Sequence, residues 1–156
     1  MLTQIPLTPA CVPPSAPVVE AGDFPRLAKK STAHRVLVVD DEALVRWSVA
    51  ETLLARGYEV VEASDGRSAI AAMGEAAAPP DVVLLDLRLP DSSDLGLLQT
   101  LRRLAPRVPV ILMTAFGTPD VVDEALEIGA SFVVNKPFEM SDLAPLVSRA
   151  LGTSCS

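Results

Sequence analysis

From residue 35 to about residue 151, short apolar runs alternate with longer amphipathic segments. This alternation is typical of repeated strand–helix units around a parallel sheet. The first, third and fourth runs are almost continuous Val, Ile and Leu, which indicates strands covered on both faces, whereas the second is mixed, as an edge strand would be. The pattern predicts five strands: Val36–Val39, Tyr58–Glu62, Val82–Leu85, Val108–Met113 and Phe132–Asn135.

Capping and stop residues place five helices in the gaps between these strands. Gly57 and Gly129 are positioned to end the first and fourth helices. Thr118 followed by Pro119 is an N-cap with proline at the first helical position. Pro145 lies near the start of the last helix, where it implies a late start or a kink. The helices are expected at about Ala43 to Arg56, Asp65 to Met73, Ser93 or Asp94 to Leu104, Thr118 to Gly129 and Ser141 to Leu151.

The first 33 residues follow a different pattern. They contain six prolines and show neither helical nor alternating apolar periodicity. Such composition predicts an extended, mostly disordered tail. We therefore expect a Pro-rich tail at residues 1–33, one folded domain at residues 34–152 and a short C-terminal tail at residues 153–156.

The overall charge excludes some partners. The formal net charge is -7 and the sequence pI is about 4.6, whereas affinity for nucleic-acid phosphates comes from clustered Lys and Arg, so direct nucleic-acid binding is not expected. No segment is apolar for long enough to cross a membrane, and no Lys or Arg precedes Arg26 as a secretory signal would require. Cys11 and Cys155 fit neither a disulfide framework nor a metal site. The expected location is the cytoplasm.

Polar residues follow four of the five predicted strands. The carboxyl ends of parallel strands line one crevice in an open α/β sheet, and ligands bind there. Each residue alone has a plain structural explanation, as a helix cap, a loop cap or a solvated charge. Their repetition at successive strand ends favours a functional site. They are Asp40 and Asp41 after the first strand, Asp86 after the third, Thr114 after the fourth and Lys136 after the fifth.

The chemistry of this set indicates phosphoryl transfer. Adjacent carboxylates at a strand end destabilise the fold unless a cation compensates them. Three carboxylates, a backbone carbonyl and waters suit Mg²⁺. The Thr114 hydroxyl and the Lys136 ammonium suit phosphoryl oxygens. Asp86 has no competing Ser, Cys or His nucleophile beside it, so it is the expected attacking carboxylate.

Four motifs occur in order and at helix-sized spacing: VLVVDDE, VVLLDLRLPD, VILMTAFG and NKPF. With them, the chain resembles a bacterial response regulator receiver domain over roughly Arg35 to Leu151. The resemblance implies a flavodoxin-like, doubly wound α/β fold with a five-stranded parallel sheet in the order 2-1-3-4-5. It also implies that a sensor histidine kinase or histidine phosphotransfer protein donates a phosphoryl group to Asp86. The chain would then be a regulatory phosphoacceptor and not an enzyme.

The resemblance also implies a ligand set for the metal. Carried over residue by residue, Asp41, Asp86 and the backbone carbonyl of Arg88 bind Mg²⁺ or Mn²⁺ directly. Asp40 contacts the ion through water. The three aspartates are the same ones that the strand ends bring together.

A second group of residues is expected around the phosphoryl oxygens. The resemblance implies that the Thr114 hydroxyl and the Ala115 N–H contact these oxygens, and that Lys136 pairs with them. It further implies a cis peptide bond between Lys136 and Pro137, a geometry that is accessible before proline.

One departure from the family pattern concerns the switch. The family usually has an aromatic residue three positions before the lysine, which swings inward when the threonine moves toward the phosphoryl group; here this residue is Val133. Phe132 lies one position earlier and should point to the opposite face of the sheet. We therefore do not expect the usual aromatic switch. Family comparisons also tie phosphoryl lifetime to the residues here occupied by Arg88 and Phe116.

The sequence leaves open what phosphorylation of the domain would act on. The chain ends a few residues past the last helix, so no output domain is expected to follow, and the output would be a protein partner, a homodimer or phosphoryl relay. A partner or homodimer would use the face made by the fourth helix, fifth strand and fifth helix. A Mg²⁺-dependent aspartyl-phosphate phosphatase is a less favoured alternative, because such enzymes carry an acid where this chain has Arg88. Flavin binding is weaker still, because the loop after the first strand is acidic.

Overall fold

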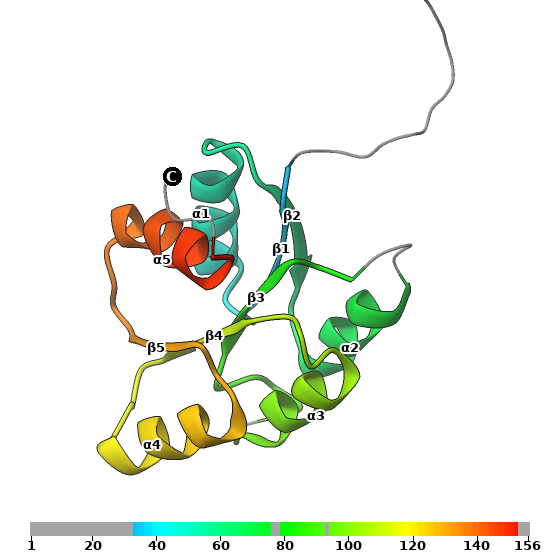
Figure 1. Ribbon diagram of the computed structural model, residues 1–156. Coiled ribbons are helices and arrows are strands. Elements are labelled where there is room, and N and C mark those ends of the chain that lie inside the picture. The colour runs from blue at the N-terminus through cyan, green and yellow to red at the C-terminus, as the bar shows by residue number, and fades with distance from the viewer. Residues whose placement is uncertain (1–32, 76–78, 93, 153–156) are drawn as a thin grey trace, which may run out of the picture. The chain divides into compact units, whose positions relative to one another are not determined.

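The computed structural model describes residues 33–75, 79–92 and 94–152 (Figure 1). The tails expected at residues 1–33 and 153–156 therefore lie, except for residue 33, outside the described residues. Five parallel strands form one sheet in the order β2-β1-β3-β4-β5, which confirms the expected flavodoxin-like topology. The strands are β1 (Arg35–Val39), β2 (Glu59–Ala63), β3 (Val82–Asp86), β4 (Val110–Thr114) and β5 (Phe132–Asn135).

Helices cover both faces of the sheet. Figure 1 shows α1 and α5 on one face and α2, α3 and α4 on the other. None of the helices in the described part of the chain has the length and hydrophobicity needed to cross a membrane. The helices are α1 (Ala43–Leu54), α2 (Gly66–Glu75), α3 (Gly96–Leu104), α4 (Pro119–Ile128) and α5 (Leu143–Ala150), with a 3₁₀ turn, η3 (Met140–Asp142), before the last.

Side chains of the central strands divide between two cores. In β1, Leu37 and Val39 pack toward α2, α3 and α4, whereas Val36 and Val38 pack toward α1 and α5. Every residue of β3 and β4 is buried, as expected for parallel strands with helices on both faces. Helices thus hold the central strands from both faces, and this fixes the positions of the residues that follow the strand ends.

The bounds of four strands differ from the sequence prediction by one or two residues, and β5 alone matches at both ends. The later starts of β2 and β4 have a local cause. β2 begins at Glu59 and not at Tyr58, because the Tyr58 N–H donates to the Leu53 carbonyl and so closes α1. β4 begins at Val110 and not at Val108, because the Val108 N–H bonds within the turn that leaves α3. In both cases, a local backbone hydrogen bond, to α1 or within the turn after α3, keeps out of the strand a residue whose side chain alone suits one.

The start of α5 shows how the last helix accommodates Pro145, for which a late start or a kink was expected. Residues 140–142 form a 3₁₀ turn, and α5 begins only at Leu143. Pro145 is then the third residue of the helix, within the first turn, where a missing N–H removes no intrahelical hydrogen bond. The late start is therefore the arrangement that the structure shows.

The third helix also starts later than its expected cap. α3 begins at Gly96, and the Asp94 carboxylate accepts a hydrogen bond from the Gly96 N–H at 2.9 Å. Asp65 caps α2 as expected, because its Oδ1 accepts from the Ser68 N–H at 2.7 Å. These short side chains set where each helix can begin.

Two leucines of α3 give a matched test of the packing. Leu98 is fully buried, whereas Leu104 is 54 % exposed. We expect Leu98→Ala to lower the free energy of unfolding by about 2–5 kcal/mol through lost burial and a cavity, and Leu104→Ala to change it by less than about 0.5 kcal/mol. Urea denaturation of both variants measures this difference, and equal effects would show that α3 does not pack as described.

Candidate functional site

The polar strand ends meet at one edge of the sheet. Val39 pairs with Leu85, so the residues that follow them, Asp40 and Asp86, lie side by side. The Lys136 ammonium, just past β5, reaches both: its Nζ is 2.8 Å from Asp40 Oδ2 and 3.4 Å from Asp86 Oδ2. The structure thus brings Asp40, Asp86 and Lys136 into one cluster, although they are far apart in the sequence.

The neighbours of Asp40 hold it in a fixed orientation. Asp40 is fully buried, and its Oδ1 accepts a hydrogen bond from the Glu42 N–H at 2.9 Å. Arg46 of α1 donates to the Asp40 carbonyl at 2.6 Å, while its Nε donates to Glu62 of β2 at 3.0 Å. The acidic turn after β1 is therefore tied to α1 and β2 as well as to Lys136.

Burial and like charge shift the protonation of the site. Burial, followed by the charge of Asp40, raises the pKa of Asp86 from 3.8 to about 6; Lys136 and the Arg88 N–H act in the opposite direction. Burial alone would lower the pKa of Lys136, but its hydrogen bond to Asp40 and the two nearby carboxylates raise it overall. The ammonium thus stays charged and neutralises part of the acidic cluster.

Three carboxylates fit a divalent cation. Asp40, Asp41 and Asp86 each offer an oxygen, and these oxygens all lie within 4.8 Å of one another. Asp41 is exposed, so an ion could reach the cluster from solvent. Hard oxygen donors with room for water are what Mg²⁺ prefers. The Arg88 N–H donates to Asp86 Oδ1 at 3.3 Å, which keeps the start of the β3–α3 loop against the same carboxylate.

The other side of the site is formed by the ends of β4 and β5. Thr114 is 1 % exposed, and its hydroxyl oxygen accepts from the Phe116 N–H at 3.0 Å. The Lys136 N–H donates to the Thr114 carbonyl at 2.7 Å. The Lys136–Pro137 peptide bond is cis. Ala115, Lys136 and Pro137 are among the residues that line a pocket of about 370 Å³ beside the acids.

Two residues that support the site were not found from the sequence. Arg46 follows Glu42 by one helical turn, and this spacing after an acidic cluster was the available signal. Asp91 of the β3–α3 loop accepts from the N–H groups of Gly66 and Arg67, at 2.7 and 3.0 Å, and so caps α2 from 24 or 25 positions away. No local pattern gives such a long-range cap.

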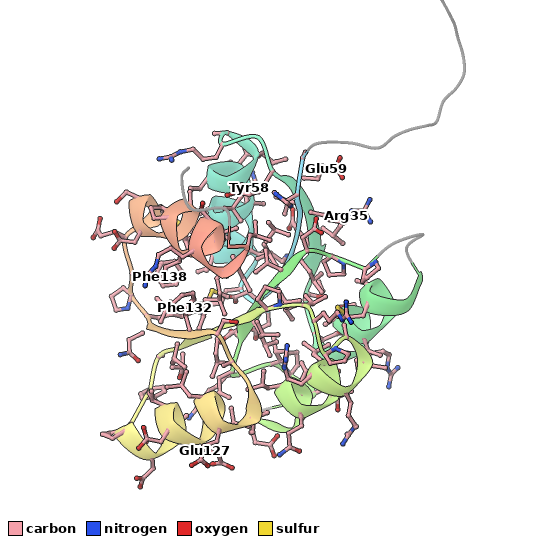
Figure 2. All side chains as sticks on the ribbon, in the orientation of Figure 1. Arg35, Tyr58, Glu59, Glu127, Phe132 and Phe138 are labelled. Atoms are coloured by element: carbon pink, nitrogen blue, oxygen red, sulfur yellow. The ribbon has the colours of Figure 1, made fainter. Side chains whose placement is uncertain are left out.

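The residues around the expected switch position lie on opposite faces of β5. Val133 packs with the core beneath α2, α3 and α4, whereas Phe132 packs with the core beneath α1 and α5. Figure 2 shows Phe132 near Phe138, which belongs to the same core. The Arg149 guanidinium of α5 lies 5.0 Å from the centre of the Phe132 ring. No aromatic ring therefore occupies position 133, and Phe132 has a different environment.

Comparison with known proteins identifies the family. A family model described as the response regulator receiver domain matches residues 36–148. The chain belongs to the response regulator receiver family. Members of this family bind Mg²⁺ at an acidic pocket, and this receiver domain has a cluster of three aspartates.

Individual relatives agree with this assignment. The receiver domain is 30 % identical over 120 residues to the chemotaxis protein CheY of Bacillus subtilis, covering 76 % of this chain and 98 % of that protein. It is 38 % identical over 129 residues to the transcriptional regulatory protein PdtaR of Mycobacterium tuberculosis, covering 80 % of this chain and 60 % of PdtaR. The solved receiver domain of NtrX from Brucella abortus superposes with a TM-score of 0.69 at 36 % identity, covering 76 % of this chain and 99 % of that one.

Several relatives are longer than the matched region. The chain spans 25 % of the regulatory protein AtoC of Escherichia coli, to which it is 39 % identical over 118 residues. What this receiver domain shares with such proteins is the receiver fold and its role as a phosphoacceptor in response regulators.

The raised pKa of Asp86 predicts a pH-dependent effect on stability. Above pH 6 the carboxylate is ionised in both the folded and unfolded chain, and its burial destabilises the folded state; below pH 6 the folded chain binds a proton first and this penalty shrinks. Without divalent metal, Asp86→Asn should therefore be more stable than the wild type by up to about 3 kcal/mol at pH 8 and by about half as much at pH 5.

Urea denaturation at both pH values measures this difference. Glu124→Gln, which removes an exposed carboxylate from α4, controls for the change in net charge and should show a much smaller effect. A variant at Asp86 that is no more stable than the wild type at pH 8, or a difference that grows on acidification, would contradict the assignment.

The position of Lys136 predicts competition with the metal. Its ammonium lies against two of the three carboxylates, so it should repel an incoming divalent ion. We expect Lys136→Met to raise the affinity for Mg²⁺ by about tenfold, because an opposing charge is removed at short range, and Lys136→Arg to stay near the wild type. Calorimetric titration at constant ionic strength measures both, and an unchanged affinity in Lys136→Met would argue against this competition.

Proposed function

We propose that this receiver domain accepts a phosphoryl group on Asp86, in a Mg²⁺-dependent transfer from phosphohistidine on a sensor histidine kinase or a histidine phosphotransfer protein. The observation that carries the proposal is the cluster of three carboxylates within 4.8 Å of one another, with a charged lysine against two of them. Family membership supports the same reaction class.

Asp86 is the group best placed to be the acceptor. It is 5 % exposed, at the end of the central strand β3, and it lies beside Asp40 with the Lys136 ammonium 3.4 Å from its Oδ2. In the proposed transfer, one Asp86 oxygen forms a bond to phosphorus while the bond from phosphorus to the donor imidazole nitrogen breaks, and the nitrogen keeps the electron pair. At neutral pH Asp86 is mostly ionised and so able to attack, because its pKa is about 6.

The metal ligands are proposed from the same cluster. Asp41, Asp86 and the Arg88 carbonyl would hold Mg²⁺ or Mn²⁺ directly, and Asp40 would do so through water. When bound, the ion supplies positive charge that offsets the acids and the phosphoryl oxygens. The hydrogen bonds from Glu42 and Arg46 to Asp40 keep the acidic turn in place for this role.

The phosphoryl oxygens would be held from the β4 and β5 side. The Thr114 hydroxyl and the Ala115 N–H are proposed as donors to two of them. Lys136, whose ammonium is already directed at Asp86, is proposed to pair with a third. These donors act together with the metal to stabilise the charge that is transferred to the acceptor.

The proposed output is a change in protein binding. We propose that phosphorylation alters the face formed by α4, β5 and α5, which then binds a downstream partner or a second copy of the chain. The acidic composition gives no support for direct nucleic-acid binding. The proposal places the domain in residues 34–152 and the protein in the cytoplasm, where sensor kinases present their phosphohistidines.

A phosphorylation assay tests the proposed function. We expect the protein to gain the mass of one phosphoryl group when incubated with Mg²⁺ and acetyl phosphate, and Asp86→Asn to gain none. Chelation of Mg²⁺ should abolish the reaction in the wild type. Intact mass spectrometry measures the adduct, and Mg²⁺ with beryllofluoride gives a stable stand-in for the phosphoryl group in binding measurements.

Two outcomes would change the proposal. An adduct that is unaffected in Asp86→Asn would place the acceptor elsewhere. Mg²⁺ binding without any phosphoryl uptake, from small donors or from purified kinases, would instead favour an interaction module with a receiver fold. Where the adduct forms, its passage to a second histidine protein would indicate a relay, and its persistence would indicate a binding switch.

A further inference from the structure

An arginine and a phenylalanine meet across the mouth of the site. The Arg88 guanidinium lies 4.9 Å from the centre of the Phe116 ring. Arg88 belongs to the loop after β3 and Phe116 to the loop after β4, and these strands are neighbours in the sheet. The contact therefore joins the loop that follows the proposed acceptor to the loop that follows the proposed switch threonine.

Both partners are also tied to the site through their backbones. The Arg88 N–H donates to Asp86 Oδ1 at 3.3 Å, and the Phe116 N–H donates to the Thr114 hydroxyl oxygen at 3.0 Å. Any rearrangement of Asp86 or Thr114 thus acts on one end of the contact. The ring itself is 64 % exposed, so a change at the site would be displayed on the molecular surface.

In the family, an aromatic residue on β5 usually moves together with the threonine. This chain has Val133 at that position, so β5 has no aromatic side chain there. The Val133 side chain is aliphatic, packs against the core and is too short to carry a large movement. Phe132 packs on the other face of the sheet, beside Arg149. Phe116 is an aromatic residue with a direct hydrogen bond to the Thr114 hydroxyl, which neither of the β5 residues has among the described contacts.

We propose that the Arg88–Phe116 contact is the chain's own switch: it holds the loop after β4 in the phosphoryl-free arrangement and is released when Asp86 is phosphorylated. This inference rests on the proposed function, since it assigns the element that responds to the phosphoryl group. Phe116 then takes the part that a mobile aromatic on β5 would otherwise play.

Two forces act on the contact in the same direction. If Thr114 turns its hydroxyl toward a phosphoryl oxygen, its bond from the Phe116 N–H is lost, and the loop is freed. Phosphorylation also replaces the single charge of the Asp86 carboxylate by up to two on the phosphoryl group, close to Arg88, and a charge-assisted hydrogen bond is stronger than an exposed cation–π contact. The guanidinium is therefore drawn from the ring toward the site, and the ring becomes available to an apolar partner surface.

Affinity for Mg²⁺ with beryllofluoride tests this switch. If the contact favours the phosphoryl-free arrangement, its removal makes the other arrangement easier to reach. Phe116→Leu should raise the affinity by about two- to fivefold, the factor that corresponds to one exposed cation–π contact. Phe116→Tyr keeps an aromatic ring and should match the wild type.

A double-mutant cycle separates the contact from the charge of Arg88. Arg88→Gln changes the affinity by removing both the contact and the charge, so the direction of its effect does not test the proposal. In the Arg88→Gln background, however, Phe116→Leu should have no further effect on the affinity. Arg103→Gln removes an exposed charge from α3 and controls for net charge. An equal effect of Phe116→Leu in both backgrounds, or no increase in either, would overturn the proposal.

Hydrogen exchange supplies a second readout, which a purely structural role would not move. The Phe116 amide should exchange with deuterium faster in wild-type protein with Mg²⁺ and beryllofluoride than with Mg²⁺ alone, because it has lost its acceptor. Unchanged or slower exchange would overturn the proposal while leaving phosphorylation of Asp86 intact. If Asp86→Asn binds beryllofluoride as well as the wild type does, both the proposed function and this inference fail.

Discussion

The arrangement of the site depends on two like charges, the carboxylates of Asp40 and Asp86, at the ends of the neighbouring strands β1 and β3. Asp40 and Asp86 are buried side by side because Val39 pairs with Leu85. Two carboxylates in this position repel, and burial weakens their contact with water. A nearby cation offsets this repulsion while both carboxylates are ionised. In the described structure that cation is the ammonium of Lys136.

The need to place Lys136 explains much of the surrounding architecture. β5 has to lie beside β4 and end level with it, and its register with β4 pairs Thr114 with Asn135, one residue before the lysine. Hydrogen bonds from Arg46 and from the Glu42 N–H to Asp40 hold the acidic turn in place beside it. Because Lys136 neutralises only part of the negative charge of this cluster, the cluster can also bind a metal ion.

Short-range patterns in the sequence predicted the parallel strands and their convergent ends, whereas the strand order was predicted from the family resemblance. Apolar runs identify buried strands, and the carboxyl ends of parallel strands meet at one edge. The boundaries at Tyr58 and Val108 were missed because local backbone hydrogen bonds, to α1 and within the turn after α3, decided them. The Asp91 cap on α2 and the Arg88–Phe116 contact were missed for a related reason: each joins segments that only the fold brings together.

Thr114 occupies the point where these constraints meet. Its carbonyl accepts from the Lys136 N–H at 2.7 Å, and its hydroxyl accepts from the Phe116 N–H at 3.0 Å. The first bond ties it to the residue that balances the acids, and the second ties it to an exposed ring on the next loop. Because the Thr114 side chain is buried in a packed interior, we expect a movement of Thr114 to shift β5, the loop after β4, or both.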